Sequence, residues 1–196
     1  MVAFDFDGTL TCRDSFRDDL RWRSGWRRYV AGLLALTPAA FAYLRRRDRG
    51  SLKAAMVHRF LRGETRAGIE ALATRYARVR SRGLLRPDAL RCWRDWRGRG
   101  ACLVIVTATP EIIVAPFARG LGADLLIGTR LVCDADDRVT GALDGLNCRG
   151  EEKVRRLRER FGDDLILEAA YGDSDGDTAM LAIAGEAGLR VFGARP

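Results

Sequence analysis

Two aspartates, Asp5 and Asp7, stand one residue apart in the segment VAFDFDGTLT, close to the start of the chain. The apolar residues around them predict a buried strand over Val2–Phe6, and Gly8 predicts a sharp turn directly afterwards. A carboxylate at the end of a strand can serve as a nucleophile, as a proton donor and acceptor, or as a metal ligand. The pair therefore marks a candidate catalytic site, with Gly8 allowing the turn that brings both carboxylates to one substrate group.

Three further segments carry polar residues that suit the same chemistry. Thr107 closes the apolar run ACLVIVT, Lys153 lies near the start of an expected helix, and Asp173 and Asp177 follow a strand in YGDSDGD. The chain has only two lysines, Lys53 and Lys153, among its 34 basic residues. Either chance or a need for an ammonium group keeps lysine at these two positions.

The hydrophobic pattern predicts the elements that position these residues. From residue 87 onward, short apolar runs alternate with helix-like segments, an order typical of an α/β protein with a doubly wound parallel sheet. Ligands of such sheets bind at the carboxyl ends of the strands, where the aspartates and Thr107 lie. The pattern predicts helices at Glu151–Phe161 and Thr178–Gly185, strands at Ala101–Thr107 and Asp124–Gly128, a hairpin formed by RLVC and RVTG, a strand ending at Gly172, and a last strand at LRVF.

Such a group of carboxylates needs a cation. Two unit charges about 4 Å apart repel by on the order of 4 kcal/mol at an effective dielectric constant near 20. Carboxylate oxygens are hard ligands that favour Mg²⁺ over zinc, and Mg²⁺ is usually held by one or two carboxylates together with a phosphate. We therefore expect Mg²⁺ as the cofactor and phosphoryl transfer as the reaction, with Lys153 and Thr107 binding the phosphate.

The motifs DFDGTLT, VIVT, Lys153 and YGDSDGD resemble, in this order, the four motifs of the haloacid dehalogenase (HAD) superfamily. The resemblance covers residues 1–11 and 87–196 and implies a HAD-like Rossmannoid catalytic core. The helical insert at residues 12–86 resembles the cap of the phosphoserine-phosphatase-like branch. The stretch NCRGEEKV also resembles, more loosely, the phosphatidylglycerophosphatase C-like members of that branch.

This resemblance implies a role for each matching residue. Asp5 would be the nucleophile that forms an aspartyl-phosphate, and Asp7 would act first as general acid and then as general base. Dehalogenases, phosphonatases and P-type ATPases resemble the first motif but lack its second aspartate, so Asp7 favours phosphomonoester hydrolysis. The metal ligands would be Asp5, the backbone carbonyl of Asp7, and Asp173, with Asp177 in support. The phosphate would be bound by Thr107, the Ala108 amide and Lys153.

The cap would set the substrate, and its residues leave alternatives open. Asp14, nine residues after the nucleophile, either contacts the substrate, as an acidic residue does at that place in the branch, or caps the following helix. Phosphoserine phosphatases usually carry asparagine where this chain has Gly176, which disfavours phosphoserine. We expect a lipid phosphate, such as phosphatidylglycerophosphate, or a small phosphorylated metabolite. The alternative is a non-catalytic phosphate-binding or nucleic-acid-associated protein on the same fold.

One stretch of the cap is unusually apolar. Val30–Leu44 is a fifteen-residue run flanked by Trp22, Trp26 and Tyr29 on one side and by Arg45–Arg47 on the other. It is too short to span a bilayer, which takes about 20 residues. Aromatic and arginine flanks are typical of a helix that lies in a membrane interface, whereas the alternative is a buried pair of cap helices.

Composition limits the classes of protein to which the chain can belong. A chain of 196 residues with 47% hydrophobic residues is globular, and the strand at residue 2 leaves no room for a signal peptide. We therefore expect a cytoplasmic protein, with a peripheral contact to the inner membrane face as an option. The net charge of +8 is dispersed, whereas a nucleic-acid groove needs an organised basic stripe. The five cysteines show no CxxC pair and suit reduced thiols.

Overall fold

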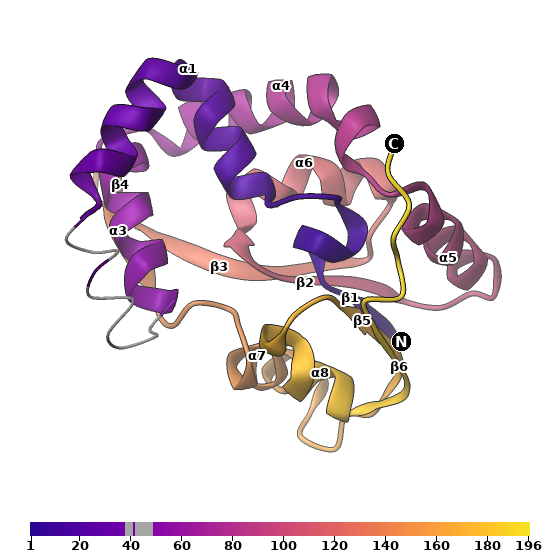
Figure 1. Ribbon diagram of the computed structural model, residues 1–196. Coiled ribbons are helices and arrows are strands. Elements are labelled where there is room, and N and C mark those ends of the chain that lie inside the picture. Colours follow the sequence, from indigo (N-terminus) through magenta and orange to yellow (C-terminus); the bar gives the residue numbers. More distant parts are fainter. Residues whose placement is uncertain (38–40, 42–48) are drawn as a thin grey trace.

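The computed structural model describes residues 1–37, 41 and 49–196, in which a six-stranded sheet carries helices on both faces (Figure 1). The strand order is β4-β3-β2-β1-β5-β6, and only β4 runs antiparallel to its neighbour. The strands are β1 (Val2–Phe4), β2 (Leu103–Pro110), β3 (Leu125–Cys133), β4 (Val139–Asp144), β5 (Leu167–Gly172) and β6 (Ala184–Leu189). The predicted doubly wound α/β architecture is confirmed.

Helices of the C-terminal part cover both faces of the sheet. The helices described are α1 (Ser15–Ala35), α3 (Arg49–Leu61), α4 (Arg66–Leu84), α5 (Pro87–Gly98), α6 (Glu111–Leu121), α7 (Glu151–Phe161) and α8 (Thr178–Ala182). Phe4 of β1 packs with α5 and α6 on one face, where its ring lies 4.7 Å from that of Tyr171 and 5.1 Å from that of Trp93. Ala3 points to the opposite face and packs with α7 and α8. Because successive side chains of β1 point to opposite faces of the sheet, this strand contributes to two separate hydrophobic cores.

The helices of residues 12–86, which we call the cap segment, have a core of their own. Phe16 of α1, Val57 of α3 and Ile69 of α4 are buried together with Val139 of β4. The hairpin of β3 and β4 therefore extends from the sheet into the cap segment, as Figure 1 shows at the side of α3. The sequence predicted this hairpin but not its contact with the cap.

Several strand boundaries differ from the predicted ones. The strand predicted at Asp124–Gly128 and the first strand of the hairpin are one strand, β3, which pairs with β2 over its first half and with β4 over its second. Gly128 suggested the end of a strand, but it lies within β3, where the neighbouring strand β2 comes too close for a side chain. A Cβ there would lie 2.9 Å from the carbonyl oxygen of Thr109. The first strand is shorter than the predicted Val2–Phe6. It ends at Phe4, because the turn Phe6–Leu10 begins directly after Asp5.

The last strand was predicted in the wrong place. It is Ala184–Leu189 rather than LRVF, and α8 ends at Ala182 rather than at Gly185. The strand consists mostly of alanine and glycine, so the apolar pattern of a strand is missing from the sequence. Gly188 lies under the ring of Tyr171, where a Cβ would come within 2.4 Å of a ring carbon. Glycine at position 188 is therefore required by packing.

A buried ion pair fixes α7 against the sheet. Arg156 is 5% exposed and donates to the carbonyl oxygens of Gly128 and, at 2.7 Å, of Leu146. Glu152, 6% exposed, accepts hydrogen bonds of 2.7 Å from both Arg155 and Arg156. These bonds, those of Arg155 foremost, lower the pKa of Glu152 to about 2. The arrangement holds the helix that carries Lys153.

We predict that Glu152→Gln lowers the free energy of unfolding at pH 7 by about 3 kcal/mol, because it leaves the buried Arg156 without its counter-charge. Because the folded pKa lies below the unfolded one, the stabilisation is full above the ordinary pKa near 4.5 and is lost as the pH falls toward 2. Urea unfolding between pH 7 and pH 3 measures this difference.

The matched control is Glu159→Gln. Glu159 also pairs with Arg155 but is exposed, so its loss should change the free energy of unfolding by less than about 0.5 kcal/mol. Equal effects of the two variants, or a Glu152→Gln effect that does not shrink in acid, would contradict the buried pair.

Candidate active site

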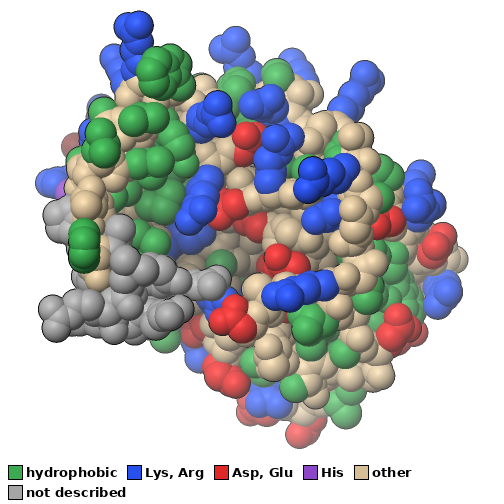
Figure 2. Space-filling view, viewed as in Figure 1, with side chains coloured by type: hydrophobic (Ala, Val, Ile, Leu, Met, Phe, Trp, Pro, Cys, Tyr) green, Lys and Arg blue, Asp and Glu red, His purple; other side chains and the backbone are tan. Residues whose placement is uncertain are grey.

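A cavity of about 490 Å³ opens at the carboxyl ends of β1, β2 and β5, between the sheet and the cap segment. Figure 2 shows acidic and basic side chains around a hollow on this face. Every residue that the sequence assigned to the site lines the cavity: Asp5, Asp7, Gly8, Asp14, Thr107, Ala108, Lys153, Asp173 and Asp177. They come from the strand ends, from α7 and from the first residues of the cap segment.

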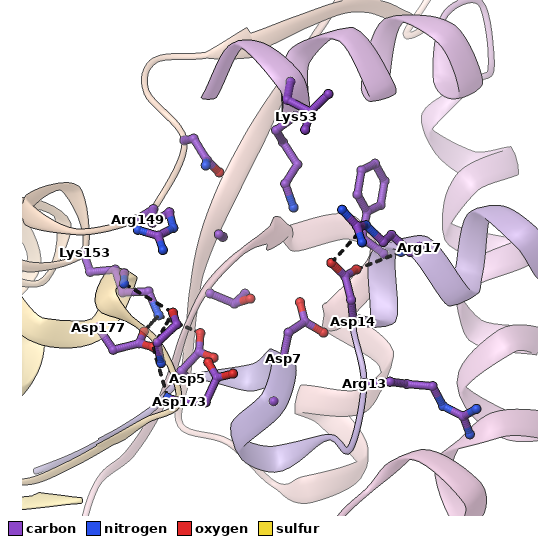
Figure 3. Close-up of a pocket in the computed structure, with 18 of the residues that line it drawn as sticks. Asp5, Asp7, Arg13, Asp14, Arg17, Lys53, Arg149, Lys153, Asp173 and Asp177 are labelled. Carbon is purple, nitrogen blue, oxygen red and sulfur yellow. Dashed lines mark hydrogen bonds and ion pairs between the residues drawn. The ribbon is translucent and has the colours of Figure 1, made fainter. Parts of the chain in front are cut away.

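Lys153 is the centre of a buried charge cluster. Its ammonium donates hydrogen bonds of 2.6 Å to Asp5 Oδ1, to Asp177 Oδ1 and to the carbonyl oxygen of Val106, and the residue is 1% exposed. Burial alone would lower the pKa of Lys153, but the two carboxylates outweigh it and raise that pKa. Lys153 therefore stays charged and fixes Asp5 in one orientation (Figure 3).

The two carboxylates of the first motif lie in different surroundings. Burial raises the pKa of Asp5 to about 7, against the lowering effect of Lys153. Asp7 instead accepts a hydrogen bond of 2.7 Å from the backbone N–H of Ser15 and one of 2.6 Å from the hydroxyl of Thr109. Burial, together with the nearby charge of Asp14, raises the pKa of Asp7. Two neighbouring carboxyl groups with separate environments suit separate roles as nucleophile and as acid.

The residues present fit a divalent cation with oxygen ligands. Carboxylate oxygens of Asp5, Asp173 and Asp177 lie within 4.8 Å of one another. Both oxygens of Asp177 are already occupied, one by Lys153 and the other by the backbone N–H groups of Asp173 and Ser174. The carboxylate of Asp173 has no hydrogen bond among the residues described, and burial and the charge of Asp177 raise its pKa. Asp5 Oδ1 accepts from Lys153, but its Oδ2 meets only the hydroxyl of Thr9, at 3.5 Å. Of the three carboxylates in this cluster, Asp5 and Asp173 could therefore bind a cation, and Asp177 orients the loop of Asp173.

Gly8 makes room for this arrangement. Its φ of +83° is a left-handed conformation that favours glycine, and a Cβ at this position would lie 2.1 Å from Asp173 Oδ2. The turn therefore allows Asp173 to approach the backbone next to Asp7. This is the close approach of backbone and carboxylate that a shared cation requires.

The second motif lines the same cavity. Thr107 is fully buried, and its hydroxyl oxygen accepts a hydrogen bond of 3.1 Å from the backbone N–H of Thr109. Ala108 is partly buried and lines the cavity beside it. Thr109 was not singled out from the sequence, although the spacing TAT in the motif places a second hydroxyl two residues on.

The structure supports the helix-cap alternative for Asp14 and also places it in the cavity. Asp14 is the N-cap of α1 and accepts a hydrogen bond of 2.8 Å from the backbone N–H of Arg17. Asp175 pairs with Arg149 and does not line the cavity, as expected of a turn residue. Gly176, which stands where asparagine was expected, lies under Arg149, whose guanidinium carbon would be 2.6 Å from a Cβ there. Glycine thus makes space for an arginine.

Other cavity residues come from the cap segment and from the loop before α7. They are Cys12, Arg13, Phe16, Arg17, Leu52, Lys53, Met56, Arg86, Asn147, Arg149 and Ser174. The scarcity of lysine pointed to Lys53, and nothing in the pattern pointed to the rest. His58 is exposed, lies next to Arg62 and is not part of the cavity lining.

Comparisons with known proteins agree with this geometry. A family model described as haloacid dehalogenase-like hydrolase matches residues 2–182. Protein CicA of Caulobacter vibrioides is 61% identical over 196 residues, which cover 100% of this chain and 88% of that protein. The phosphoserine phosphatase of Halobacterium salinarum is 34% identical over 193 residues, covering 95% of this chain and 83% of that protein.

Solved structures show the same fold. A protein of unknown function from Bordetella pertussis matches with a TM-score of 0.75 and 26% identity, covering 93% of this chain and 85% of that one. A phospho-aspartyl intermediate analogue of phosphoserine phosphatase matches with a TM-score of 0.62 and 22% identity, covering 95% and 83% of the two chains. The chain therefore belongs to the haloacid dehalogenase-like hydrolase family, in its phosphoserine-phosphatase-like branch.

Proposed function

We propose that this phosphatase is a Mg²⁺-dependent phosphomonoester hydrolase that acts through an aspartyl-phosphate on Asp5. The observation that carries the proposal is the separation of the two carboxylates. Asp5 is held by the ammonium of Lys153, whereas Asp7 is held by neutral donors, the backbone N–H of Ser15 and the hydroxyl of Thr109. A cationic partner favours the ionised form of a carboxyl group, as a nucleophile requires, and the acid that protonates the leaving oxygen needs no such partner.

The residues then divide the reaction between them. A carboxylate oxygen of Asp5 attacks the phosphorus, and Asp7 gives its proton to the leaving oxygen. Asp7 next takes a proton from the water that attacks the aspartyl-phosphate, which releases inorganic phosphate and restores Asp5. Lys153, Thr107 and the Ala108 amide would bind the phosphate oxygens and offset their charge through both steps.

Asp5, the backbone carbonyl of Asp7 and Asp173 would hold Mg²⁺, with Asp177 orienting the loop of Asp173. Bound there, the cation would neutralise charge on the phosphoryl group in the transition state. The hydrogen bonds that the backbone N–H groups of Asp173 and Ser174 donate to Asp177, together with the close approach of Asp173 to Gly8, support this assignment.

The substrate class proposed is a lipid phosphate or a small phosphorylated metabolite. The relative from Halobacterium salinarum is named for phosphoserine, so O-phosphoserine belongs in any substrate screen. The alternative, a non-catalytic phosphate-binding or nucleic-acid-associated protein, predicts retention of nucleic acid in a filter-binding assay without hydrolysis. The complete set of charged residues around Lys153 favours the enzyme.

Asp5→Asn should lower the turnover of p-nitrophenyl phosphate by about 1,000-fold or more, because the nucleophile is lost. Circular dichroism should show an unchanged fold, since the amide keeps the shape of the side chain. Asp175→Asn is the matched control, because Asp175 is exposed and does not line the cavity. Near-wild-type turnover by Asp5→Asn would rule out the aspartyl-phosphate.

Removal of metal by EDTA should stop hydrolysis, and Mg²⁺ should restore it better than Ca²⁺. Calcium accepts more ligands in looser geometry, which would misplace Asp5 for attack on the phosphorus. Steady-state kinetics after dialysis against EDTA, with each cation added back, measures this. Full activity without added metal would refute the metal assignment.

Two glycine variants test the same site by geometry. Gly8→Ala and Gly100→Ala impose similar backbone strain, since φ is +83° and +78°, but only the Cβ at position 8 meets Asp173. We expect Gly8→Ala to raise the Mg²⁺ concentration needed for half activity about tenfold or more, at about 1.4 kcal/mol for each factor of ten. Gly100→Ala should only lower stability. Equal Mg²⁺ requirements of the two variants would contradict a cation beside Gly8.

As a second candidate, we propose that the cap segment makes a peripheral contact with an anionic bilayer. After Gly25, whose backbone breaks the helix, α1 exposes a stripe of apolar side chains at helical spacing. These are Trp26 (64% exposed), Val30 (43%), Leu33 (41%) and Leu34 (69%). Phe41 is also exposed (65%), and Figure 2 shows hydrophobic side chains gathered over the α1 end of the molecule.

Three arginines of α1 lie near this stripe, and two of them are exposed. Arg27 and Arg28 are exposed, but Arg23 is tied to the buried Asp19 at 2.8 Å and is removed from the surface. Trp22 and Tyr29 also pack inward, against the rings of aromatic residues on α4 and α3.

The rest of this stretch lies outside the described residues. That holds for residues 38–40 and 42–44 of the apolar run and for the arginines at 45–47. In the part of the chain that the structure describes, no helix is long and apolar enough to cross a membrane. The proposed contact therefore rests on the exposed stripe of α1 with Arg27 and Arg28.

Co-sedimentation with anionic vesicles at low ionic strength tests this contact. We expect the protein to pellet, and the double change Arg27→Gln with Arg28→Gln to weaken binding about tenfold, at about 1 kcal/mol for each basic residue. The matched control removes Arg158 and Arg160 on α7, at the far side of the sheet. No pelleting, or equal effects of both pairs, would leave a soluble phosphomonoester as the substrate proposed.

A further inference from the structure

The segment after β6 runs back across the core to the start of α5. Figure 1 shows it in yellow, passing from β6 to a position beside α5. We call residues Arg190–Ala194 the strap segment. It lies outside the helices and strands, but the ring of Phe192 anchors its middle, 5.4 Å from the ring of Tyr171 and 6.5 Å from that of Phe4. Aromatic contacts of this kind fix the segment against the core.

One end of the strap segment contacts the loop after β5. The backbone N–H of Arg190 donates a hydrogen bond of 2.8 Å to the carbonyl oxygen of Gly172, and its guanidinium donates one of 2.6 Å to that of Asp173. Arg190 has a φ of +55°, a left-handed conformation that is uncommon in residues other than glycine. Such a conformation persists where the surrounding contacts determine it. The strap segment therefore holds the backbone of a candidate metal ligand.

The other end is held by α5. The carboxylate of Asp88 accepts hydrogen bonds of 2.8 Å from the backbone N–H groups of Gly193 and Ala194. The carbonyl oxygen of Ala194 in turn accepts a hydrogen bond of 3.1 Å from the guanidinium of Arg86. Asp88 lies in the first turn of α5 and does not line the active-site cavity. It thus holds the strap segment from outside the site.

Arg86 connects the strap segment to the catalytic turn. Its Nε donates to the carbonyl oxygens of Gly8, at 3.2 Å, and of Thr11, at 3.1 Å. Its backbone N–H donates a further hydrogen bond of 2.9 Å to the carbonyl oxygen of Leu10. One guanidinium therefore binds the strap segment and the turn that carries Asp7. Because the donor is charged, these hydrogen bonds are stronger than those between neutral groups.

Together these contacts form a closed ring beside the candidate metal site. Arg86 holds Gly8, Arg190 holds Asp173, and the strap segment joins the two arginines. Gly8 and Asp173 complete the ring, since a Cβ on Gly8 would lie 2.1 Å from Asp173 Oδ2. The carboxylates of Asp5 and Asp173 repel each other when no cation lies between them. A restraint outside the cavity opposes this repulsion and keeps the two loops together.

Resting on the proposed Mg²⁺ site, we infer that Asp88, Arg86 and Arg190 are positioning residues. They act through the strap segment to set the distance between the catalytic turn and the Asp173 loop, and thereby the affinity for Mg²⁺. Mg²⁺ demands nearly octahedral geometry with ligands at about 2.0–2.1 Å, so a displacement of either loop weakens its binding. The coupling is reciprocal: Mg²⁺ stabilises the strap segment by the same factor by which the strap segment favours Mg²⁺.

The variant Asp88→Ala tests this inference, because it releases Gly193 and Ala194 without changing the catalytic turn or the Asp173 loop. Titration calorimetry with Mg²⁺ and no substrate measures the dissociation constant. We expect an increase of about fivefold or more, the lower end of typical couplings between two sites. Asp88→Asn keeps an acceptor oxygen and should bind Mg²⁺ like the wild type. An Asp88→Ala protein that is folded by circular dichroism and binds Mg²⁺ as tightly as the wild type would overturn the inference.

A pair of arginine variants gives a second measurement from the other end of the strap segment. Arg190→Met removes the donor to Asp173 and should also raise the dissociation constant about fivefold or more. Arg138→Met is the matched control, because Arg138 is likewise exposed and donates to a backbone carbonyl, that of Gly63, but does not line the cavity. It should leave Mg²⁺ binding unchanged. Equal effects of the two variants would overturn the inference.

Hydrogen exchange in the wild type tests the reciprocal effect. Saturation with Mg²⁺ should slow the exchange of the Gly193 and Ala194 amide protons about fivefold or more, as followed by NMR. A role of Asp88 in the stability of α5 alone does not predict this change. Exchange that is unaffected by Mg²⁺ would overturn the coupling between the strap segment and the metal site.

Failure of the proposed metal site has a different signature. In that case the wild type itself shows no heat of Mg²⁺ binding, which refutes the site and the inference together. A wild type that binds Mg²⁺ but shares its dissociation constant with Asp88→Ala and Arg190→Met refutes the inference alone. Calorimetry without substrate makes this distinction whichever phosphomonoester the enzyme hydrolyses.

Discussion

The hydrogen bonds of one buried ammonium, that of Lys153, hold the active site together. Lys153 contacts Asp5 just after β1, Val106 within β2 and the turn before α8, so a single cation joins parts of the chain that are 148 residues apart. Removing one partner from such a cluster leaves the others as uncompensated buried charges, which costs several kcal/mol. The position of α7 is therefore tightly constrained. The buried ion pair of Glu152 and Arg156 helps to hold the helix there, because Arg156 also binds backbone carbonyl oxygens outside α7.

This cluster also explains why two neighbouring carboxylates can act differently. Asp5 points to the ammonium, whereas Asp7 points across the turn to a hydroxyl and a backbone N–H group. In a continuous strand, residues two apart project from the same face and would share their surroundings. Here the strand stops at Phe4 and the chain turns through the left-handed backbone of Gly8, so both carboxylates reach one cavity but meet different partners. The backbone of Asp5–Gly8 thus determines which hydrogen-bond partners each carboxylate meets.

Much of the core site could be predicted from sequence because its residues stand in short segments at strand ends. Asp5, Thr107 and Asp173 are placed by the parallel sheet, whose carboxyl ends meet at one edge. Residues placed by the packing of cap helices, such as Phe16 and Met56, could not be predicted, because their position depends on contacts far apart in the sequence. The strand β6 was misplaced for a related reason: it consists mostly of alanine and glycine, and Gly188 is required by contact with the Tyr171 ring, which lies far away in the sequence.

The contact between Ser15 and Asp7 has a consequence for how this enzyme can be altered. Ser15 is the first residue of α1, and its N–H group donates a hydrogen bond to Asp7, the carboxylate proposed to transfer the proton. On the proposed mechanism, the first helix of the cap segment therefore also bears on the acid–base chemistry of Asp7. Exchange of the whole insert between relatives would disturb proton transfer as well as selectivity. A hybrid enzyme would have to keep the native junction up to the first turn of α1 and take its new specificity from residues beyond it.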